Sequence, residues 1–145
     1  MMNAELAWDG WARERQQRIE RVLDRCLPSD ETGRSALHRA MRYATLGGGK
    51  RVRPLLAYAA GEVAAADVAV VDAAAAAVEI IHGYSLVHDD LPCMDDDTLR
   101  RGQPTCHVAF GEAMALLAGD ALQALAFEVL ARGGLPAPGP ACAEL

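Results

Sequence analysis

Apolar and polar residues recur along most of the chain with the spacing of amphipathic helices. The segment 4–26 mixes Arg, Glu and Gln with apolar residues at roughly this spacing, and Pro28 ends it. Residues 34–46 form a second amphipathic segment that ends at three consecutive glycines, and Pro54 suits an early position of a third helix. The pattern therefore predicts a helical N-terminal part.

Two further segments are longer and more apolar. Residues 66–91 are rich in Ala and Val and poor in polar residues, which predicts a buried helix that Pro92 ends. Residues 111–131 predict a last helix, and residues 132–145 have the composition of a loop or linker. Because no segment shows β-type alternation between turn residues, we expect an all-α fold without strands.

Length and charge narrow the class of protein. A chain of 145 residues with 52% hydrophobic residues can form one domain with its own core. Its net charge of −6 disfavours binding to nucleic acid or anionic membranes, so we expect small molecules or proteins as partners. The N-terminus lacks the basic start and apolar run of a signal peptide, and no stretch approaches the about twenty apolar residues of a membrane span. A cytoplasmic location is the simplest expectation.

The cysteine pattern gives no sign of a metal cage or a disulfide framework. The chain has four cysteines and no C-x-x-C pair. They are Cys26, Cys93, Cys106 and Cys142. We expect them to stay reduced.

An acidic cluster follows the long apolar segment. Asp89 and Asp90 fall in the last turn of the predicted helix, where the negative end of the macrodipole disfavours carboxylates. Three more aspartates, at 95–97, follow across the break at Pro92. Such a group of oxygen donors suits Mg²⁺, which takes a few carboxylates together with water and phosphate oxygens, and it lacks the spacing of an EF-hand loop. The alternative is a solvated acidic loop that caps the next element.

Two basic motifs flank this cluster. Arg100 and Arg101 have guanidinium groups that bind phosphate in a bidentate manner, or that merely neutralise the aspartates. Upstream, GGGKRVRP places Lys50, Arg51 and Arg53 after three glycines at a helix start, which outlines an anion site. A P-loop is excluded because no Ser or Thr follows the lysine and no strand precedes the glycines. A helix-capping glycine beside a basic surface patch is the alternative.

Two polar residues lie within otherwise apolar helical segments. His82 precedes Asp89 by seven residues, or two helical turns, so the imidazole and the carboxylate are expected to point into one space. The alternative for His82 is a core histidine with its hydrogen bonds satisfied. For Asp120, a structural hydrogen bond or a cap is as good an interpretation as a functional role.

Three stretches between residues 38 and 131 resemble the trans-isoprenyl diphosphate synthases, and most closely their bacterial farnesyl-producing members. The stretches are GGGKRVRPLL, HGYSLVHDDLPCMDDDTLRRGQPTCH and FGEAMALLAGDALQALAF. The resemblance implies an antiparallel α-helical bundle of the isoprenoid synthase type with a deep central cavity, usually in a homodimer. It also implies Mg²⁺-dependent condensation of isopentenyl diphosphate with an allylic diphosphate, either dimethylallyl or geranyl diphosphate.

The same resemblance implies a role for each residue that matches a family motif. The residues expected to hold isopentenyl diphosphate are Lys50, Arg53, His82 and Arg101. Asp89 and Asp95 would bind Mg²⁺, and Arg100 would contact the allylic diphosphate. Tyr84 lies five residues before the first aspartate, at the position that limits product length in the family, and a bulky ring there is typical of the C15-producing type.

The chain departs from this family in length. Family members are considerably longer and carry a second aspartate-rich motif and a lysine in their C-terminal half, and neither occurs here. We therefore expect residues 1–145 to be the N-terminal part of a single synthase domain that needs a C-terminal half for activity. One alternative is a non-catalytic subunit that binds a full-length partner. Another is an acidic helical Mg²⁺-binding module without an isoprenoid role.

Overall fold

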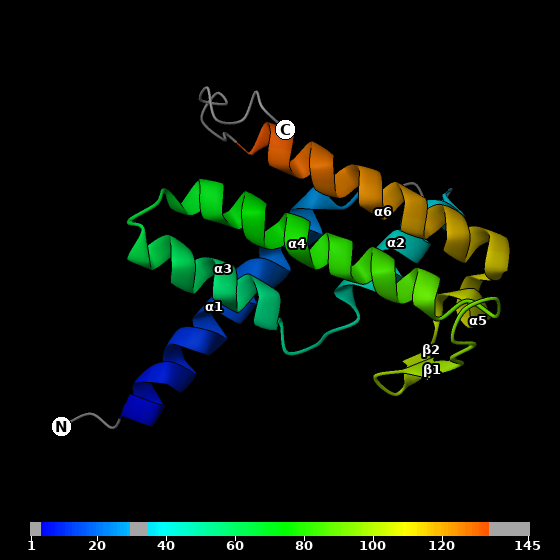
Figure 1. Ribbon diagram of the computed structural model, residues 1–145, viewed down its shortest axis with the longest axis horizontal. Coiled ribbons are helices and arrows are strands. Elements are labelled where there is room, and N and C mark those ends of the chain that lie inside the picture. Colours follow the sequence, from blue (N-terminus) through cyan, green and yellow to red (C-terminus); the bar gives the residue numbers. More distant parts are fainter. Residues whose placement is uncertain (1–3, 30–34, 134–145) are drawn as a thin grey trace.

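The computed structural model describes residues 4–29 and 35–133, and it confirms the all-α class (Figure 1). The helices are α1 (Ala4–Cys26), α2 (Ala36–Leu46), α3 (Val52–Val63), α4 (Val68–Asp89), α5 (Cys106–Phe110) and α6 (Glu112–Arg132). The four longer segments and the helix at Pro54 were each predicted to within a few residues. Residues 134–145, most of the predicted terminal loop, lie outside the described residues, as does Cys142.

The long apolar helix α4 forms the centre of the bundle. It lies between α3 and α6 and runs antiparallel to both (Figure 1). Its contact with α6 is the most extensive between any two described elements, and small side chains make it possible because they allow the two backbones to approach closely. Fully buried alanines from the two helices are Ala75, Ala76, Ala115 and Ala118.

The helix starts have the expected chemistry. The side chain of Ser35 accepts a hydrogen bond from the backbone N–H of His38 at the start of α2. Asp67 does the same for Ala69 at the start of α4, at 2.7 Å. Pro54 lies in the first turn of α3, where its missing N–H costs no helical hydrogen bond.

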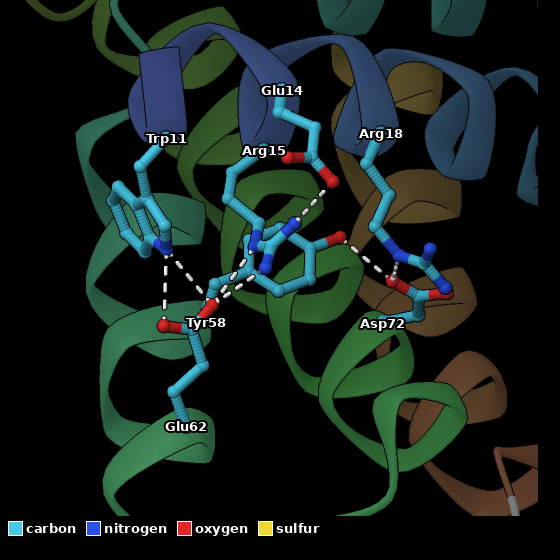
Figure 2. A network of polar contacts seen from close by, with 7 residues as sticks. All are labelled: Trp11, Glu14, Arg15, Arg18, Tyr58, Glu62 and Asp72. Atoms are coloured by element: carbon cyan, nitrogen blue, oxygen red, sulfur yellow. Dashed lines mark hydrogen bonds and ion pairs between the residues drawn. The ribbon is translucent and has the colours of Figure 1, made fainter. Parts of the chain in front are cut away.

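Helix α1 is fastened across α3 and α4 by a polar network (Figure 2). Trp11 and Arg15 of α1 both donate to the carboxylate of Glu62 in α3, with the shortest bond at 2.7 Å. Arg18 binds Asp72 of α4 in a bidentate manner, at 2.6 and 2.7 Å. These contacts fix the position of α1 relative to the two helices that carry half of the predicted site residues.

The buried phenol of Tyr58 joins the same network. Its hydroxyl donates to Asp72 at 2.8 Å, and the side chain is 2% exposed. Burial, together with the hydrogen bond to Asp72, raises the pKa of Tyr58 well above its usual value. The phenol therefore stays protonated and remains a donor.

A short β-hairpin corrects the expectation of a fold without strands. Strands β1 (Leu99–Arg100) and β2 (Gln103–Pro104) pair in an antiparallel manner. The residues between them, Arg101 and Gly102, have φ values of 55° and 78°, as in the two-residue turns with positive φ that match strand twist. Strands of two residues are too short to show an alternating pattern, although the Arg-Gly turn is a signal of the hairpin.

Helices α4 and α6 are long and apolar enough, by length and composition alone, to cross a membrane. The share of the most apolar window that is buried in the structure is 50% for α4 and 28% for α6. The expectation that no stretch approaches a span is therefore wrong on these two criteria. The alanines that fill the contact between α4 and α6 also raise the hydropathy of both helices, and core helices of soluble proteins pass the same test.

Candidate functional site

The C-terminal end of α4 turns back and brings two predicted metal ligands close together in space. Asp89 is the last residue of α4, and the backbone N–H of Asp95 donates to its carbonyl oxygen at 2.8 Å. Two more backbone bonds to the carbonyl of Leu91, from Met94 and Asp96, close the same turn. Asp89 is half-buried and Asp95 is exposed. This segment, residues 89–96, which we call the acidic turn, therefore carries both aspartates at one end of the bundle.

The neighbouring Asp90 has a different environment. It is 3% exposed, and the Nε of Arg100 donates to its two carboxylate oxygens at 3.0 and 2.9 Å. Arg100 thus compensates the carboxylate that the helix dipole disfavours, and the hydrogen bond with Asp90 raises the pKa of Arg100. The interpretation of Arg100 as a neutralising residue is confirmed for Asp90. Its contact with an allylic diphosphate stays a prediction.

The hairpin that carries Arg100 is anchored at its base. The Thr105 hydroxyl donates to the carbonyl of Asp97 at 2.7 Å, and the Thr105 N–H donates to the carbonyl of Thr98 at 3.0 Å. On the other side, the hydroxyl of Tyr43 in α2 donates to the carbonyl of Pro104 at 2.7 Å. The hairpin is therefore held against α2 and the end of α4.

The glycine loop between α2 and α3 meets the tip of this hairpin. The guanidinium of Arg101 donates to the carbonyl oxygen of Gly48. Gly49 has a φ of 132°, and a Cβ at this position would lie 2.8 Å from the guanidinium carbon of Arg101. The backbone thus favours glycine at residue 49, and a side chain there would displace the guanidinium of Arg101. Gly47 caps α2 and Gly49 lies beside Arg101, so the run of glycines serves both as a helix cap and as part of the basic site.

This meeting of loop and hairpin creates an open pocket that we call the cation pocket. It gathers the four residues expected to hold one diphosphate: Lys50, Arg53, His82 and Arg101. Its remaining lining residues are Gly49, Arg51, Val52 and Glu79. Lys50 and Arg53 are exposed, and within the described part of the chain their side chains make no hydrogen bond or ion pair. Their positive charges are therefore available to an anion.

His82 belongs to the cation pocket, and its surroundings favour the uncharged imidazole. Burial lowers its pKa, nearby arginines led by Arg53 lower it further, and Glu79 opposes the shift. Asp89 lies about 10 Å further along the axis of α4, from a rise of 1.5 Å per residue, and does not line the described pocket. The structure thus groups His82 with the cations, and a space shared with Asp89 stays a prediction.

Arg51 is buried, whereas its basic neighbours Lys50 and Arg53 are exposed, although no local sequence pattern distinguishes the three. It is 3% exposed, and its guanidinium donates to Glu20 at 2.7 Å, to Glu79 at 2.8 Å and to the carbonyl of Thr45 at 2.9 Å. Burial would lower the pKa of Arg51, but its bonds to the two carboxylates outweigh burial and raise it. Neither glutamate was predicted from the sequence. The signal for Glu79 was an acid flanked by apolar residues within the buried stretch of α4.

Tyr84 packs beside a histidine that contacts α6. Its half-buried ring makes an edge-to-face contact with His88, with centroids 5.3 Å apart. His88 Nε2 lies 3.0 Å from the carbonyl of Leu116, and a Cβ at Gly119 would lie 2.0 Å from the same nitrogen. Asp120 lies inside α6, so it is not a cap, and its carboxylate is 3.8 Å from His88 Nε2, too far for a hydrogen bond.

The carboxylates suit a metal that shares its coordination with a ligand. Among residues 4–29 and 35–133, no group of three or more His, Cys, Asp or Glu side chains is close enough to hold a metal by itself. Arg100 pairs with Asp90 and lies 3.6 Å from Asp97, and Asp89 and Asp95 are the two carboxylates that the family resemblance predicts as ligands. Two carboxylates fit Mg²⁺, because Mg²⁺ keeps several waters and takes phosphate oxygens as further ligands.

Comparison with known proteins gives a consistent result. The polyprenyl synthetase family profile matches residues 34–143. The farnesyl diphosphate synthase of Haemophilus influenzae is 57% identical over 117 residues, which are 81% of this chain and 40% of that protein. The farnesyl diphosphate synthase of Escherichia coli is 62% identical over 96 residues, which are 66% of this chain and 32% of that protein.

Solved structures show the same fold. A geranyltransferase from Legionella pneumophila matches 90% of this chain with a TM-score of 0.84 and 46% identity, over 46% of its own length. An FPP/GFPP synthase from Zymomonas mobilis matches 88% of this chain with a TM-score of 0.82 and 49% identity, also over 46% of its length. The chain therefore spans less than half the length of the relatives it matches.

Proposed function

Because the chain belongs to the polyprenyl synthetase family, we propose that it supplies the diphosphate-binding part of a prenyltransferase. The proposed reaction condenses isopentenyl diphosphate with geranyl diphosphate to give farnesyl diphosphate, with release of diphosphate and a proton. Dimethylallyl diphosphate would reach the same product through two successive condensations. The observation that carries the proposal is the gathering of Lys50, Arg53, His82 and Arg101 in one pocket, from three separate segments of the chain.

The cation pocket would hold the diphosphate of isopentenyl diphosphate. Lys50, Arg53 and Arg101 offer three positive charges, and two of them are guanidinium groups suited to bidentate binding of phosphate oxygens. His82, neutral because of its lowered pKa, would add a hydrogen bond without further charge. No group in this pocket belongs to the acidic turn, which suits a diphosphate that is retained in the product.

The acidic turn would hold the allylic diphosphate. Asp89 and Asp95 would ligate Mg²⁺, which in such a site stabilises negative charge as it develops on a departing diphosphate. Arg100, kept protonated and oriented by Asp90, would face the same leaving group. The chain would then supply no nucleophilic side chain, because the double bond of isopentenyl diphosphate attacks the allylic carbon.

Product length would depend on Tyr84. This residue lies five positions before Asp89, about 7.5 Å along the helix axis. A prenyl tail that extends along α4 from the acidic turn would meet the phenol ring, and the contact of that ring with His88 would restrict its movement. We assign Tyr84 the role of the floor of a C15-sized pocket.

Activity would require structure beyond the described residues. The matched relatives extend to more than twice the matched length, so we propose that a complementing C-terminal half, within a homodimer, completes the site. The alternative is a non-catalytic subunit that binds a full-length synthase. One relative, 54% identical over 113 residues, is the large subunit of a heterodimeric geranylgeranyl pyrophosphate synthase from Arabidopsis thaliana.

Co-expression tests the proposal. The chain would be produced with the C-terminal part of the Haemophilus influenzae relative that follows the matched segment, and assayed with geranyl and isopentenyl diphosphates in Mg²⁺. We expect farnesyl diphosphate from the pair and none after Asp89→Asn. If the pair is inactive while the chain alters the rate of an intact synthase, and Asp89→Asn has no effect on that change, the subunit alternative holds instead.

A further inference from the structure

Helix α1 contacts residues that line the cation pocket, although it lies before residue 34, where the match to the family profile begins. We propose that Glu20 and Gln16 of α1 are positioning residues for the isopentenyl diphosphate site, acting through Arg51 and the backbone of Lys50. The family match begins at residue 34 and assigns no role to α1, which spans Ala4–Cys26. This inference rests on the proposed function of the pocket.

Arg51 is bound by three helices and so anchors the loop of residues 47–51, which we call the pocket loop. Its guanidinium binds Glu20 of α1 at 2.7 Å, Glu79 of α4 at 2.8 Å and the carbonyl of Thr45 of α2 at 2.9 Å. The side chains of Arg51 and Glu79 are 2% and 4% exposed. A buried charge-assisted contact of this kind fixes one geometry, because moving the arginine would leave a carboxylate unpaired in the interior.

The contacts of the Arg51 side chain stabilise an unusual backbone conformation at this residue. Its φ and ψ are 51° and 37°, a left-handed conformation that is uncommon for residues other than glycine and persists only where the surroundings enforce it. Lys50 precedes this residue and Arg53 follows it by two positions. The enforced turn at Arg51 therefore sets the directions in which the two pocket cations leave the chain.

A second contact from α1 holds the same loop. The side-chain amide of Gln16 donates to the carbonyl oxygen of Lys50 at 2.9 Å. On the opposite side, Arg101 holds the carbonyl of Gly48. The loop is thus held by contacts from both α1 and the hairpin. Preorganised cations bind a diphosphate more tightly because less ordering remains to be done on binding.

Helix α1 also offers a matched control. Glu62 of α3 accepts hydrogen bonds from Trp11 and Arg15, and this cluster fastens α1 without touching the residues that line the cation pocket (Figure 2). Loss of Glu62 loosens α1 generally, whereas loss of Glu20 releases the pocket loop. Both glutamates are partly exposed, so neither change should prevent folding.

The test measures binding of isopentenyl diphosphate to the 145-residue chain by isothermal titration calorimetry, together with the thermal midpoint of each variant. We expect Glu20→Ala to weaken binding about tenfold, equivalent to about 1.4 kcal/mol, and Glu62→Ala to change it less than twofold at a similar loss of thermal midpoint. Gln16→Ala, the milder second variant, should weaken binding about threefold. Lys50→Ala reports on the pocket itself.

The outcomes separate the two proposals. If Lys50→Ala weakens binding but Glu20→Ala and Gln16→Ala do not, the role of α1 is overturned and the pocket assignment stands. If Glu20→Ala and Glu62→Ala weaken binding equally, α1 acts only through general stability and the inference is again overturned. If the unmodified chain does not bind isopentenyl diphosphate, both proposals fail.

Discussion

The contact between the glycine loop and the hairpin tip yields a prediction with an internal control. Gly48 and Gly49 both have positive φ, at 80° and 132°, so alanine at either position strains the backbone by about 1–3 kcal/mol. Only Gly49 lies against Arg101, since a Cβ there would be 2.8 Å from the guanidinium, whereas no neighbouring atom lies within 4 Å of a Cβ at Gly48. Comparison of the two alanine variants therefore isolates the effect of displacing Arg101.

The expected difference follows from what Arg101 loses. In Gly49→Ala the guanidinium must move, which removes its hydrogen bond to the carbonyl of Gly48, a contribution of about 0.5–1.5 kcal/mol for an exposed group. Displacement of one phosphate-binding cation from the pocket should also weaken binding of isopentenyl diphosphate about tenfold. Gly48→Ala should lose stability through strain but keep its affinity within about twofold of the unmodified chain.

Two measurements on the same protein samples decide the matter. Urea unfolding gives the free energy of unfolding of each variant, and calorimetric titration with isopentenyl diphosphate gives its affinity. Equal affinities in the two alanine variants would refute the assignment of Arg101 to the cation pocket, whatever their stabilities. Affinity lost only in Gly49→Ala would support it.

Three further predictions concern the acidic turn, the role of Tyr84 in product length and the pH dependence of stability. In a completed enzyme, Asp89→Ala should lower turnover on the order of 10²-fold and Asp97→Ala far less, and equal losses in a steady-state assay would contradict the Mg²⁺ assignment. Tyr84→Ala should give C20 or longer alcohols after dephosphorylation of the products, whereas unchanged C15 at reduced yield would indicate a packing role. Because folding lowers the pKa of His82, the free energy of unfolding should fall as pH drops below about 6.5, and His82→Gln should reduce this dependence in urea titrations at pH 7.5 and 5.5.

The helices were predictable from sequence because each carries its own signal. Apolar spacing and the stops at Pro28 and Pro92 placed α1 and α4 to within a few residues. The short hairpin was missed since two-residue strands have no periodicity. The membrane criterion was misjudged because alanine contributes to hydropathy as well as to close helix packing.

The site was predictable only in part, because burial is a property of the folded chain. Lys50 and Arg51 are adjacent basic residues that no local pattern distinguishes, yet one is exposed to the pocket and the other is 3% exposed and paired. Glu20 looks like any acid of a surface helix until the fold places it 2.7 Å from Arg51. Motif resemblance found residues that match a family pattern, but contacts made by α1 lie outside that pattern.

A single rigid helix carries members of both proposed diphosphate sites. His82 and Asp89 lie seven residues apart on α4, which makes the helix a fixed spacer of about 10 Å between the two sites. Insertion of one residue between them would lengthen the spacer by about 1.5 Å but would also rotate one site relative to the other by about 100°. We therefore expect the segment to accept substitutions but not single-residue insertions, so a design that needs a different separation between the two diphosphates would move the glycine loop or the hairpin instead.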